Sequence, residues 1–573
     1  MESFLQFDFK DRPLSFSEPL EIVTADYIHE VQGAFERIEK ALEKGYYAAG
    51  FIAYEAAPAF DPAYKVHGNT KTPLVWFGIY EQAHVPKSRV YPNGGFQVGE
   101  WKMDIDMKEY GSGINQIKNA IEAGDTYQVN YTARMKASFH GDEYAFYQQL
   151  YKNQQGAYSA YLDIGDYAVL SASPELFFQI RDRQIIAKPM KGTARRGKTV
   201  EEDQLLVNGL TESEKERAEN LMIVDLLRND IGRIAKPGTV TVPQLFEVEK
   251  YPTVHQMTST IKAELEEGKR VFDWFEALFP CGSITGAPKI STMEYINELE
   301  QSPRGIYCGA IGYITPYREA IFNVPIRTVV LDKREREAIY GAGGGITWDS
   351  TAEGEYEELQ TKARLLTERR KVFQLLESIK LEEGQFPLLK YHLKRLSDSA
   401  RYFGFLIDIS RVINELDDIA DKIPSGTHKV RLLMDHRGEI HVESAPVIRM
   451  DSIKYSLADR PINTENSFLY HKTTNREAYE SHVIRAPERA DVVLLYNENN
   501  ELTEFTIGNI VVESEGEYFT PPVSCGLLQG TYRQKLLDEK VLREKVIKKK
   551  HLFDFDSVWM INSVRGWVKA QII

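Results

Sequence analysis

The chain has 573 residues, enough for about three to four ordinary domains, or fewer if one of them is a large layered α/β structure. Its hydrophobic content of 43% and mean hydropathy of −0.38 are typical of a soluble globular protein. A net charge of −14 and a pI near 5.5 work against non-specific binding to nucleic acid or anionic membranes, so an anionic ligand must be held by local cations.

The cysteines, Cys281, Cys308 and Cys525, are odd in number and lack metal-ligand spacing, which predicts neither a disulfide framework nor a zinc site. The amino terminus lacks a basic stretch followed by an apolar core, and no run of about 18 apolar residues occurs. We therefore expect a cytoplasmic protein without a targeting or membrane-spanning segment.

Hydrophobic periodicity predicts the first elements in chain order. A helix is expected over Ile28–Leu42, followed by a strand over Ala48–Tyr54. A second helix is expected over Ile114–Ala123, because Gly124 after it is a typical helix stop, and Thr126–Thr132 then reads as a strand.

Glu175 interrupts the strand-like run Val169–Ile180 in the sequence S-A-S-P-E-L-F. An unpaired buried carboxylate tends to protonate, which is the environment that a general acid needs. The alternative interpretation is a glutamate at a solvent-facing strand position.

Lys191 stands before a Gly-Thr step in the stretch K-P-M-K-G-T-A-R-R-G at 188–197. Burial penalises the charged form of an amine, and a neutral amine near pH 7 can act as a nucleophile. The alternative is a solvated surface turn, because short motifs of this kind also occur without function.

Two pairs of glutamates follow. A long helix expected over Asp203–Ile234 carries Glu216 and Glu219, which share one face, and Glu355 and Glu358 repeat the same spacing. Two carboxylate pairs suggest one metal ion, and oxygen ligands without histidine or cysteine favour Mg²⁺ over zinc. Solvated glutamate pairs are the alternative.

Arg327 lies in the apolar run N-V-P-I-R-T-V-V-L, where a buried guanidinium must be paired, best with a carboxylate or phosphate. The glycine run Gly341–Gly345 would leave backbone N–H groups free to meet an anion. Together these features predict a carboxylate cradle. His255 alone is more typical of a core histidine.

Six ordered blocks within residues 1 to about 370 resemble the chorismate-utilising family, namely G-D-T-Y-Q-V-N, S-P-E-L-F, P-M-K-G-T-A-R-R-G, K-E-R-A-E-N-L-M-I-V-D-L-L-R-N-D, G-S-I-T-G-A-P-K and G-A-G-G-G-I. The resemblance implies a large α/β (α+β) sandwich of antiparallel sheets flanked by helices. It implies that Glu219 and Glu358 bind Mg²⁺ with support from Glu216 and Glu355, and that Glu175 protonates a departing C4 hydroxyl. The substrate would be held by Arg327, Tyr307, Thr285, His255, Gly343, Gly344 and Gly345.

Two positions separate members of that family. Members that add water carry a lysine where this chain has Gln128, and anthranilate synthases carry a small residue where it has Lys191. Aminodeoxychorismate synthases have a lysine there, thought to attack C2, so Lys191 favours amination at C4. Asn220 stands where relatives commonly have histidine.

A new pattern begins after a short connection near residues 369–372, where no Pro, Gly or Ser tract occurs. Turn and helix signals place a turn at Gly384 and an amphipathic helix ending at Gly404. Beyond them lie H-K-T-T-N-R, L-T-E-F-T-I-G-N-I and C-G-L-L-Q-G-T-Y-R, which together contain a lysine, a strand carboxylate and a Gly-Thr loop. With an arginine on the preceding helix, these groups form a set that suits pyridoxal phosphate. Taken singly, each is more typical of ordinary surface.

Residues 372–573 resemble the fold-type IV pyridoxal phosphate enzymes, which have two subdomains. The resemblance implies that Lys472 is the Schiff-base lysine, that Glu504 faces the pyridine nitrogen, and that Arg395, Gly530 and Thr531 bind the phosphate. The segment I-N-S-V-R-G-W at 561–567 matches a closing strand near the cofactor. No motif separates a lyase from a transaminase.

Domains over 1–370 and 371–573 would together convert chorismate and ammonia to 4-amino-4-deoxychorismate and then to 4-aminobenzoate, a folate precursor, with release of pyruvate. No glutaminase motif is visible, so we expect ammonia to come free or from a separate glutamine amidotransferase subunit. The resemblance leaves room for a homodimer through the second domain. The alternatives are an anthranilate synthase component fused to an aminotransferase, and a second domain that binds without catalysing.

Overall fold

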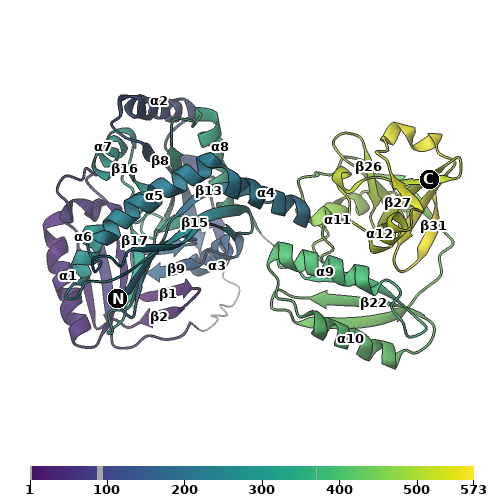
Figure 1. Cartoon of the computed structure of the whole chain (residues 1–573), viewed down its shortest axis with the longest axis horizontal. Coiled ribbons are helices and arrows are strands. Elements are labelled where there is room, and N and C mark those ends of the chain that lie inside the picture. Colours follow the sequence, from purple (N-terminus) through teal and green to yellow (C-terminus); the bar gives the residue numbers. More distant parts are fainter. Residues whose placement is uncertain (1–2, 87–94, 370) are drawn as a thin grey trace. The chain divides into compact units, whose positions relative to one another are not determined.

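The computed structural model describes residues 3–86, 95–369 and 371–573, and within them the chain forms two compact units (Figure 1). The second unit comprises Arg196–Leu206 and Lys371–Ile573, and the first unit comprises the rest. The expected connection near residues 369–372 includes residue 370, which lies outside the described residues. Of the described helices, none is long and apolar enough to cross a membrane.

The first unit contains, among its described residues, two ten-stranded sheets whose pairings are antiparallel. The first sheet runs in the order β16 (Gly286–Ala287), β8 (Gln128–Gly141), β20 (Glu337–Ile346), β19 (Thr328–Asp332), β10 (Tyr167–Ser171), β9 (Tyr158–Asp163), β1 (Phe4–Phe9) and β2 (Leu14–Ser17), with β6 (Phe96–Val98) and β7 (Lys102–Met103) also on β8.

The second sheet runs in the order β13 (Met190–Arg195), β15 (Val254–Glu264), β12 (Gln184–Lys188), β11 (Leu176–Arg181), β18 (Ala320–Asn323), β17 (Ala310–Ile314), β4 (Tyr47–Ile52), β5 (Val75–Tyr80) and β3 (Glu21–Ala25), with β14 (Thr241–Lys250) also on β15. The helices of this unit are α1 (Ile28–Glu43), α2 (Met107–Ala123), α3 (Glu143–Gln154), α5 (Glu214–Gly232), α6 (Val271–Leu278), α7 (Lys289–Leu299) and α8 (Ala352–Ala363), and α4 (Val200–Glu212) spans both units.

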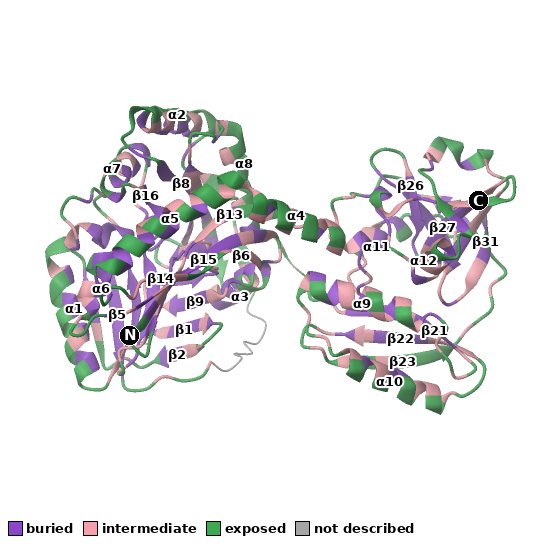
Figure 2. Cartoon of the chain, viewed as in Figure 1, coloured by how far each residue is buried: buried purple, intermediate pink, exposed green. Residues whose placement is uncertain are grey.

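The two sheets pack face to face, because one buried cluster joins apolar side chains of both, such as Phe7 and Leu162 from the first and Phe51 and Tyr313 from the second. Separate clusters join the outer face of each sheet to helices, with α1, α5 and α6 on the second sheet and α2 and α3 on the first. Figure 2 shows the buried residues concentrated in the strands and the exposed ones on the outer helix faces. The predicted sandwich of antiparallel sheets flanked by helices is therefore confirmed.

The predicted helix over Ile28–Leu42 and the strand over Ala48–Tyr54 are confirmed within two residues as α1 and β4. The helix predicted from Ile114 instead begins at Met107, because Asp106 accepts a hydrogen bond from the N–H of Glu109 at 2.8 Å and forms a capping box. Gly124 ends this helix in the left-handed conformation, at a φ of 83°.

The single helix predicted over Asp203–Ile234 is wrong. Ser213 separates α4 from α5, and its hydroxyl caps α5 by accepting the N–H of Glu216 at 3.3 Å. The glycine run Gly341–Gly345 lies inside β20 and pairs with β8. β19 pairs with β20 only as far as Tyr340. Beyond that residue, every second backbone N–H group of the glycine run therefore has no hydrogen-bond partner on a neighbouring strand among the described residues.

The second unit contains two sheets among its described residues. A three-stranded sheet runs β21 (Leu375–Glu382), β22 (Thr427–Met434) and β23 (Ile440–Pro446), and it packs with α9 (Leu389–Phe403) and α10 (Ile409–Lys422). The larger, eight-stranded sheet runs β26 (Leu502–Phe505), β25 (Val492–Tyr496), β24 (Ser452–Leu457), β31 (Gly566–Ile572), β30 (Ser557–Asn562), β27 (Gly508–Ser514), β28 (Glu517–Thr520) and β29 (Leu542–Glu544).

Because β26 also pairs with β27, six strands of the larger sheet close on themselves around a core of aliphatic and aromatic side chains. Two short helices, α11 (Glu477–Val483) and α12 (Thr531–Asp538), belong to this subdomain. Gly404 ends α9 in the left-handed conformation, and Gly384 has a φ of 71°, which confirms the predicted helix end and turn. The two sheets form the two expected subdomains.

The segment Arg196–Leu206 is held in the second unit by Tyr402 of α9. The Arg196 guanidinium lies 4.4 Å above the ring of Tyr402 and donates to its carbonyl at 2.8 Å, and the Tyr402 hydroxyl donates to the carbonyl of Gly197 at 2.7 Å. Arg196 also pairs with Asp203 at 2.8 Å, with side chains only 8% and 5% exposed. Because this ion pair is buried, each partner keeps the other from being an isolated charge.

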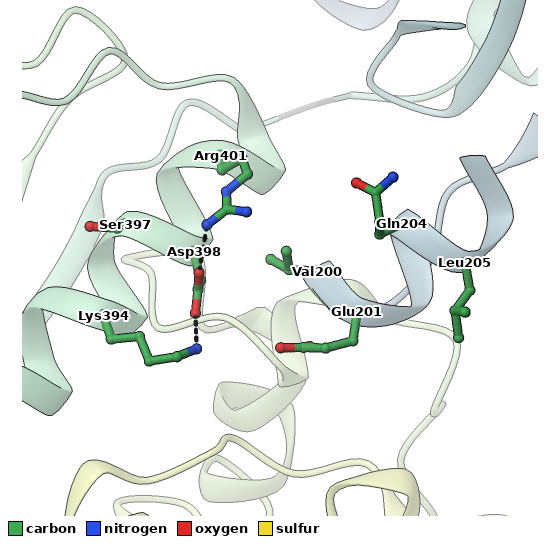
Figure 3. Close-up of a pocket in the computed structure, with 8 residues that line it drawn as sticks. All are labelled: Val200, Glu201, Gln204, Leu205, Lys394, Ser397, Asp398 and Arg401. Carbon is green, nitrogen blue, oxygen red and sulfur yellow. Dashed lines mark hydrogen bonds and ion pairs between the residues drawn. The ribbon is translucent and has the colours of Figure 1, made fainter. Parts of the chain in front are cut away.

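A groove of about 650 Å³ lies beside this segment, between the first turns of α4 and the surface of α9 (Figure 3). Within it Asp398 accepts from Lys394 at 2.6 Å and from Arg401 at 3.1 Å. These charges neutralise one another on an open surface, so the groove has no arrangement of convergent groups for a ligand.

We predict that Asp203→Ala lowers the free energy of unfolding by about 3–5 kcal/mol, because it leaves Arg196 buried without its carboxylate. Equilibrium urea unfolding measures this change. Asp225→Ala is the matched control, since the Asp225–Arg228 pair is exposed and its loss costs at most about 1 kcal/mol. Equal losses in the two variants would contradict the structural role of the buried pair.

Candidate active sites

Lys191 lies on β13, half-buried, with its amine against the backbone of β20. A Cβ atom added to Gly345 would lie 2.2 Å from Lys191 Nζ and 2.0 Å from Gln128 Nε2, so both side-chain ends crowd this glycine. Burial lowers the pKa of Lys191, and the Lys362 charge adds to that effect while Glu219 opposes it. The amine is thus easier to deprotonate than one in water.

Gln128 begins β8 and is fully buried. Neither its Nε2 nor its Oε1 atom has a hydrogen-bond partner among the described residues. Buried amides are nearly always hydrogen-bonded in folded proteins, so an orphaned one indicates a ligand or water that completes it. The orphaned amide is thus free to hydrogen-bond a ligand or a water molecule in the space beside Lys191.

Glu175 lies between β10 and β11 and is 3% exposed. Burial raises its pKa to about 7, although the Ser283 hydroxyl, which donates to Oε1 at 2.6 Å, and the Lys191 charge both oppose the rise. A carboxyl group with this pKa can donate a proton at neutral pH. Ser283 itself escaped the sequence analysis, although it lies in the quoted block G-S-I-T-G-A-P-K.

The four glutamates come from α5 and α8. Glu358 pairs with Lys362 at 2.7 Å, and Glu355 accepts from Ser350 at 2.7 Å. Burial raises the pKa of both Glu216 and Glu355, and the neighbouring carboxylates Glu219 and Glu358 raise them further. Four carboxylates that repel one another offer the oxygen ligands that Mg²⁺ prefers. Among the described residues, however, no three such side chains lie close enough together to form one metal-binding group.

The predicted substrate-binding residues lie in different surroundings. The Tyr307 ring packs on Gly341 of β20, where an added Cβ would lie 2.4 Å from its Cδ1 atom. Thr285 is buried and its hydroxyl donates to the Cys281 carbonyl at 3.1 Å, so it stabilises its own turn. His255 is fully buried on β15, opposite Ala194 of β13.

Arg327 is not inside a strand, as the sequence suggested, but in the bend before β19, half-buried and with a φ of 54°. Its charge lowers the pKa of Glu358, after the larger effects of Lys362 and Lys191. Gly344 is close to the same group, since a Cβ there would lie 2.9 Å from Glu355 Oε2. Lys362, which donates to the Gly343 carbonyl at 2.6 Å, was missed, although its spacing of four from Glu358 is a helix ion-pair signal.

The second unit has a cavity of about 470 Å³ that brings together the five predicted cofactor residues. Lys472, Glu504, Arg395, Gly530 and Thr531 all line it, although they come from distant parts of the sequence. Burial and, after it, the Arg395 charge lower the pKa of Lys472 to about 8. An amine with this pKa is nucleophilic near neutral pH.

Glu504 is held on β26 by the Tyr479 hydroxyl at 2.8 Å, the Leu528 N–H at 3.0 Å and the Asn509 amide at 3.2 Å. Burial nevertheless raises its pKa to about 7. A cationic ring nitrogen beside it would restore the carboxylate, because an opposite charge favours the ionised form. Tyr479 was missed by the sequence analysis.

Arg395 makes two hydrogen bonds to Glu377, at 2.9 and 2.6 Å. Burial works to raise the pKa of Glu377, but Arg395 and His392 hold it at about 2. Thr531 begins α12 next to Gly530, and its hydroxyl lies 3.3 Å from His392 Nε2. A helix N-terminus beside a guanidinium fits a phosphate group, so the residues present fit pyridoxal phosphate.

The segment predicted as a closing strand is in part a turn. Ile561 and Asn562 end β30, residues 563–565 form the turn, and β31 begins at Gly566. The turn lines the same cavity.

Two folds thus each carry a set of buried ionisable side chains. Residues 11–368 match the family described as chorismate binding enzyme, and residues 374–573 match amino-transferase class IV. The chain belongs to the chorismate binding enzyme family and carries in addition a class IV aminotransferase domain.

The relatives match the first part of the chain. Aminodeoxychorismate synthase component 1 of Salmonella typhimurium is 44% identical over 258 residues, which are 45% of this chain and 56% of that protein. Anthranilate synthase component 1 of Aquifex aeolicus is 39% identical over 266 residues, 46% of this chain and 53% of that protein. The chain thus spans little more than half the length of these curated relatives.

A solved structure, anthranilate synthase component I from Streptococcus pneumoniae, superposes with a TM-score of 0.53 at 26% identity. The superposition covers 64% of this chain and 90% of that one. The fold of the first unit is therefore shared with a protein of this family.

We predict that Gly345→Ala lowers turnover at this site by about 100-fold, because the new methyl group displaces Lys191 Nζ and Gln128 Nε2 and a shift of about 1 Å can cost that much. The displaced atoms are the ends of flexible side chains, so the thermal midpoint should change little. Steady-state kinetics and thermal unfolding measure the two effects.

Gly209→Ala is the control for the Gly345 substitution, because it lies in α4 with no atom within 4 Å of the added carbon. It should leave turnover unchanged. Full turnover in Gly345→Ala would show that Lys191 and Gln128 are not placed for chemistry.

Proposed function

We propose that the first domain, residues 1–370, converts chorismate and ammonia to 4-amino-4-deoxychorismate and water, and that the second, residues 371–573, converts this product to 4-aminobenzoate and pyruvate. The observation that carries the proposal is the position of Lys191, whose amine lies beside Gly345 and the orphaned amide of Gln128. The resemblance assigns a lysine at this position to amination at C4. The aminodeoxychorismate synthase relatives support the same assignment.

In the first step Lys191 Nζ attacks C2 of chorismate as the hydroxyl leaves C4, and Glu175 donates the proton with which the hydroxyl departs as water. Ammonia then bonds to C4 and expels the neutral lysine amine from C2, and the proton released by the new C4 amine returns to the Glu175 carboxylate, which restores the enzyme. Gln128 lies beside the reacting amine and can hydrogen-bond the substrate. Because Gln128 is neutral, it does not activate a water molecule in place of ammonia.

Glu219 and Glu358 would hold Mg²⁺, with Glu216 and Glu355 beside them, and the ion would neutralise the substrate carboxylate. Arg327 supplies a further positive charge near Glu358. Tyr307, packed on Gly341, closes the backbone side of the site. Ammonia would come from solution or from a separate glutamine amidotransferase subunit.

In the second step bound pyridoxal phosphate supplies an electron sink for the elimination. Lys472 is the amine that would anchor it and carry a proton to and from the substrate. Glu504, fixed by Tyr479 and Leu528, stabilises positive charge at the ring nitrogen. Arg395, Gly530 and Thr531 bind its phosphate.

Product analysis tests both steps. Purified protein is given chorismate, Mg²⁺, ammonium and pyridoxal phosphate, and we expect 4-aminobenzoate and pyruvate in equal amounts. Lys191→Ala should lose most 4-aminated product, whereas Lys472→Ala should accumulate 4-amino-4-deoxychorismate without pyruvate. The formation of 2-aminobenzoate would contradict the proposal and support an anthranilate synthase, for which the anthranilate synthase relatives are the reason.

The first step should slow as pH rises through about 7. Glu175 must be protonated to donate, and its acid form is present below its pKa of about 7 and lost above it. The pH profile of kcat/KM for chorismate consumption measures this limb, with saturating ammonia to hold that substrate constant. In Glu175→Gln the limb should vanish and the rate fall by about 100-fold or more; a limb that persists would assign it to another group.

A further inference from the structure

The cavity around Lys472 holds far more positive than negative charge. Among the described residues that line it, six are cationic and one, Glu504, is a carboxylate. The chain as a whole has a net charge of −14. Because gathering like charges in a half-buried space is unfavourable, such an excess indicates an occupant with several negative charges.

Three of the six cations are accounted for by the cofactor set or by contacts of their own. Lys472 and Arg395 belong to the cofactor set, and Arg395 is bound to Glu377. Arg476 donates to the Thr506 carbonyl and lies 4.5 Å above the Tyr479 ring. The remaining three, Lys429, Arg431 and Arg565, are here named the cationic wall, and no cofactor role accounts for them.

The cationic wall is built on two packed elements. Lys429 and Arg431 are two residues apart on β22 and so share one face of the three-stranded sheet, and Ser378 of β21 lies opposite Arg431. The Ser563 hydroxyl donates to the Ser378 carbonyl at 3.0 Å, which fixes the turn that carries Arg565 to this sheet. Asn562 Oδ1 accepts the Arg565 N–H at 2.8 Å and holds the turn itself.

Charge on the cationic wall is only partly compensated. Arg431 pairs with Glu443 at 2.9 Å across the strand pair, but that pair is open to solvent. Arg565 Nε is buried without a hydrogen-bond partner among the described residues. Burial lowers the pKa of Lys429, and the charges of Arg565 and Arg431 lower it further, which shows that the three groups act on one another.

We propose that the cationic wall binds the carboxylates of the substrate, so that this cavity selects an amine that bears two carboxylates over one that bears a single carboxylate. In naming a substrate the inference rests on the proposed function, because 4-amino-4-deoxychorismate has one carboxylate on its ring and another on its enolpyruvyl arm. A guanidinium presents paired donors that match a carboxylate. Lys429, Arg431 and Arg565 are thus residues that determine specificity.

The test is a binding titration of the cofactor-loaded protein with isophthalate, a non-reacting dicarboxylate, and with benzoate, its monocarboxylate counterpart. The absorbance of the bound cofactor reports occupancy of this cavity alone. We expect isophthalate to bind at least 10-fold more tightly than benzoate. In Arg431→Gln and Arg565→Gln this preference should fall to less than about 3-fold, because one charge-assisted carboxylate contact is worth about 10- to 100-fold in affinity.

Two control variants keep the result specific. Arg431→Lys keeps the charge and should retain part of the preference, and Arg449→Gln removes an exposed charge that does not line the cavity and should retain all of it. In the lyase step Arg431→Gln should raise KM for 4-amino-4-deoxychorismate by about 10-fold or more and leave kcat within about threefold. Cofactor absorbance confirms that each variant is folded and loaded.

Equal binding of isophthalate and benzoate to the wild-type protein would overturn the inference. So would variants that weaken cofactor affinity and leave the dicarboxylate preference intact, because the wall would then hold the cofactor phosphate. Failure to form 4-aminobenzoate in the product analysis, with a wall-dependent isophthalate preference, would refute the proposed lyase activity and leave the inference standing.

Discussion

The first unit depends on the glycines of β20 at positions 341, 344 and 345. Tyr307 packs on Gly341, Glu355 approaches Gly344, and Lys191 and Gln128 crowd Gly345, each closer than a Cβ atom would permit. Because β19 stops pairing at Tyr340, this stretch has a ladder only with β8 and leaves room for side chains from β13 and α8. The glycines of this strand are thus what allow groups from both sheets to converge.

Bringing these side chains together buries them away from water, and this burial determines their protonation states. Burial lowers the pKa of Lys191 and raises that of Glu175 to about 7, so that burial favours the neutral forms of both. The second unit repeats this arrangement with Lys472 and Glu504, whose pKa values move to about 8 and about 7. In the first unit a neutral amine beside a neutral acid is the state in which Lys191 can attack and Glu175 can donate a proton, whereas Glu504 regains its charge when a cationic ring nitrogen lies beside it.

Local sequence predicted the elements better than the site. The helix break at Ser213 does have a local signal, because S-E-K-E is a capping-box sequence. Hydrophobic periodicity alone does not detect this signal. The glycine run had no such signal: whether Gly341–Gly345 forms a loop or a strand is decided by its pairing with β8, about 200 residues away in the chain. Likewise the orphaned amide of Gln128 exists only because distant strands bury it.

The charged residues give a second example of what composition predicts and what only the structure shows. Composition indicates an acidic protein that must hold any anion with local cations, and the structure shows that such cations are gathered at the Lys472 cavity. Their positions could not be predicted, since β22 and the turn after β30 are far apart in the sequence and are brought together by contacts such as that of Ser563 with Ser378 of β21. An acidic surface repels anionic ligands, whereas a cationic cavity within it attracts them. Each electrostatic field reaches only about 8 Å at physiological salt, so the attraction acts at short range. Selectivity for an anion in this unit therefore arises inside the cavity, where desolvation strengthens each contact.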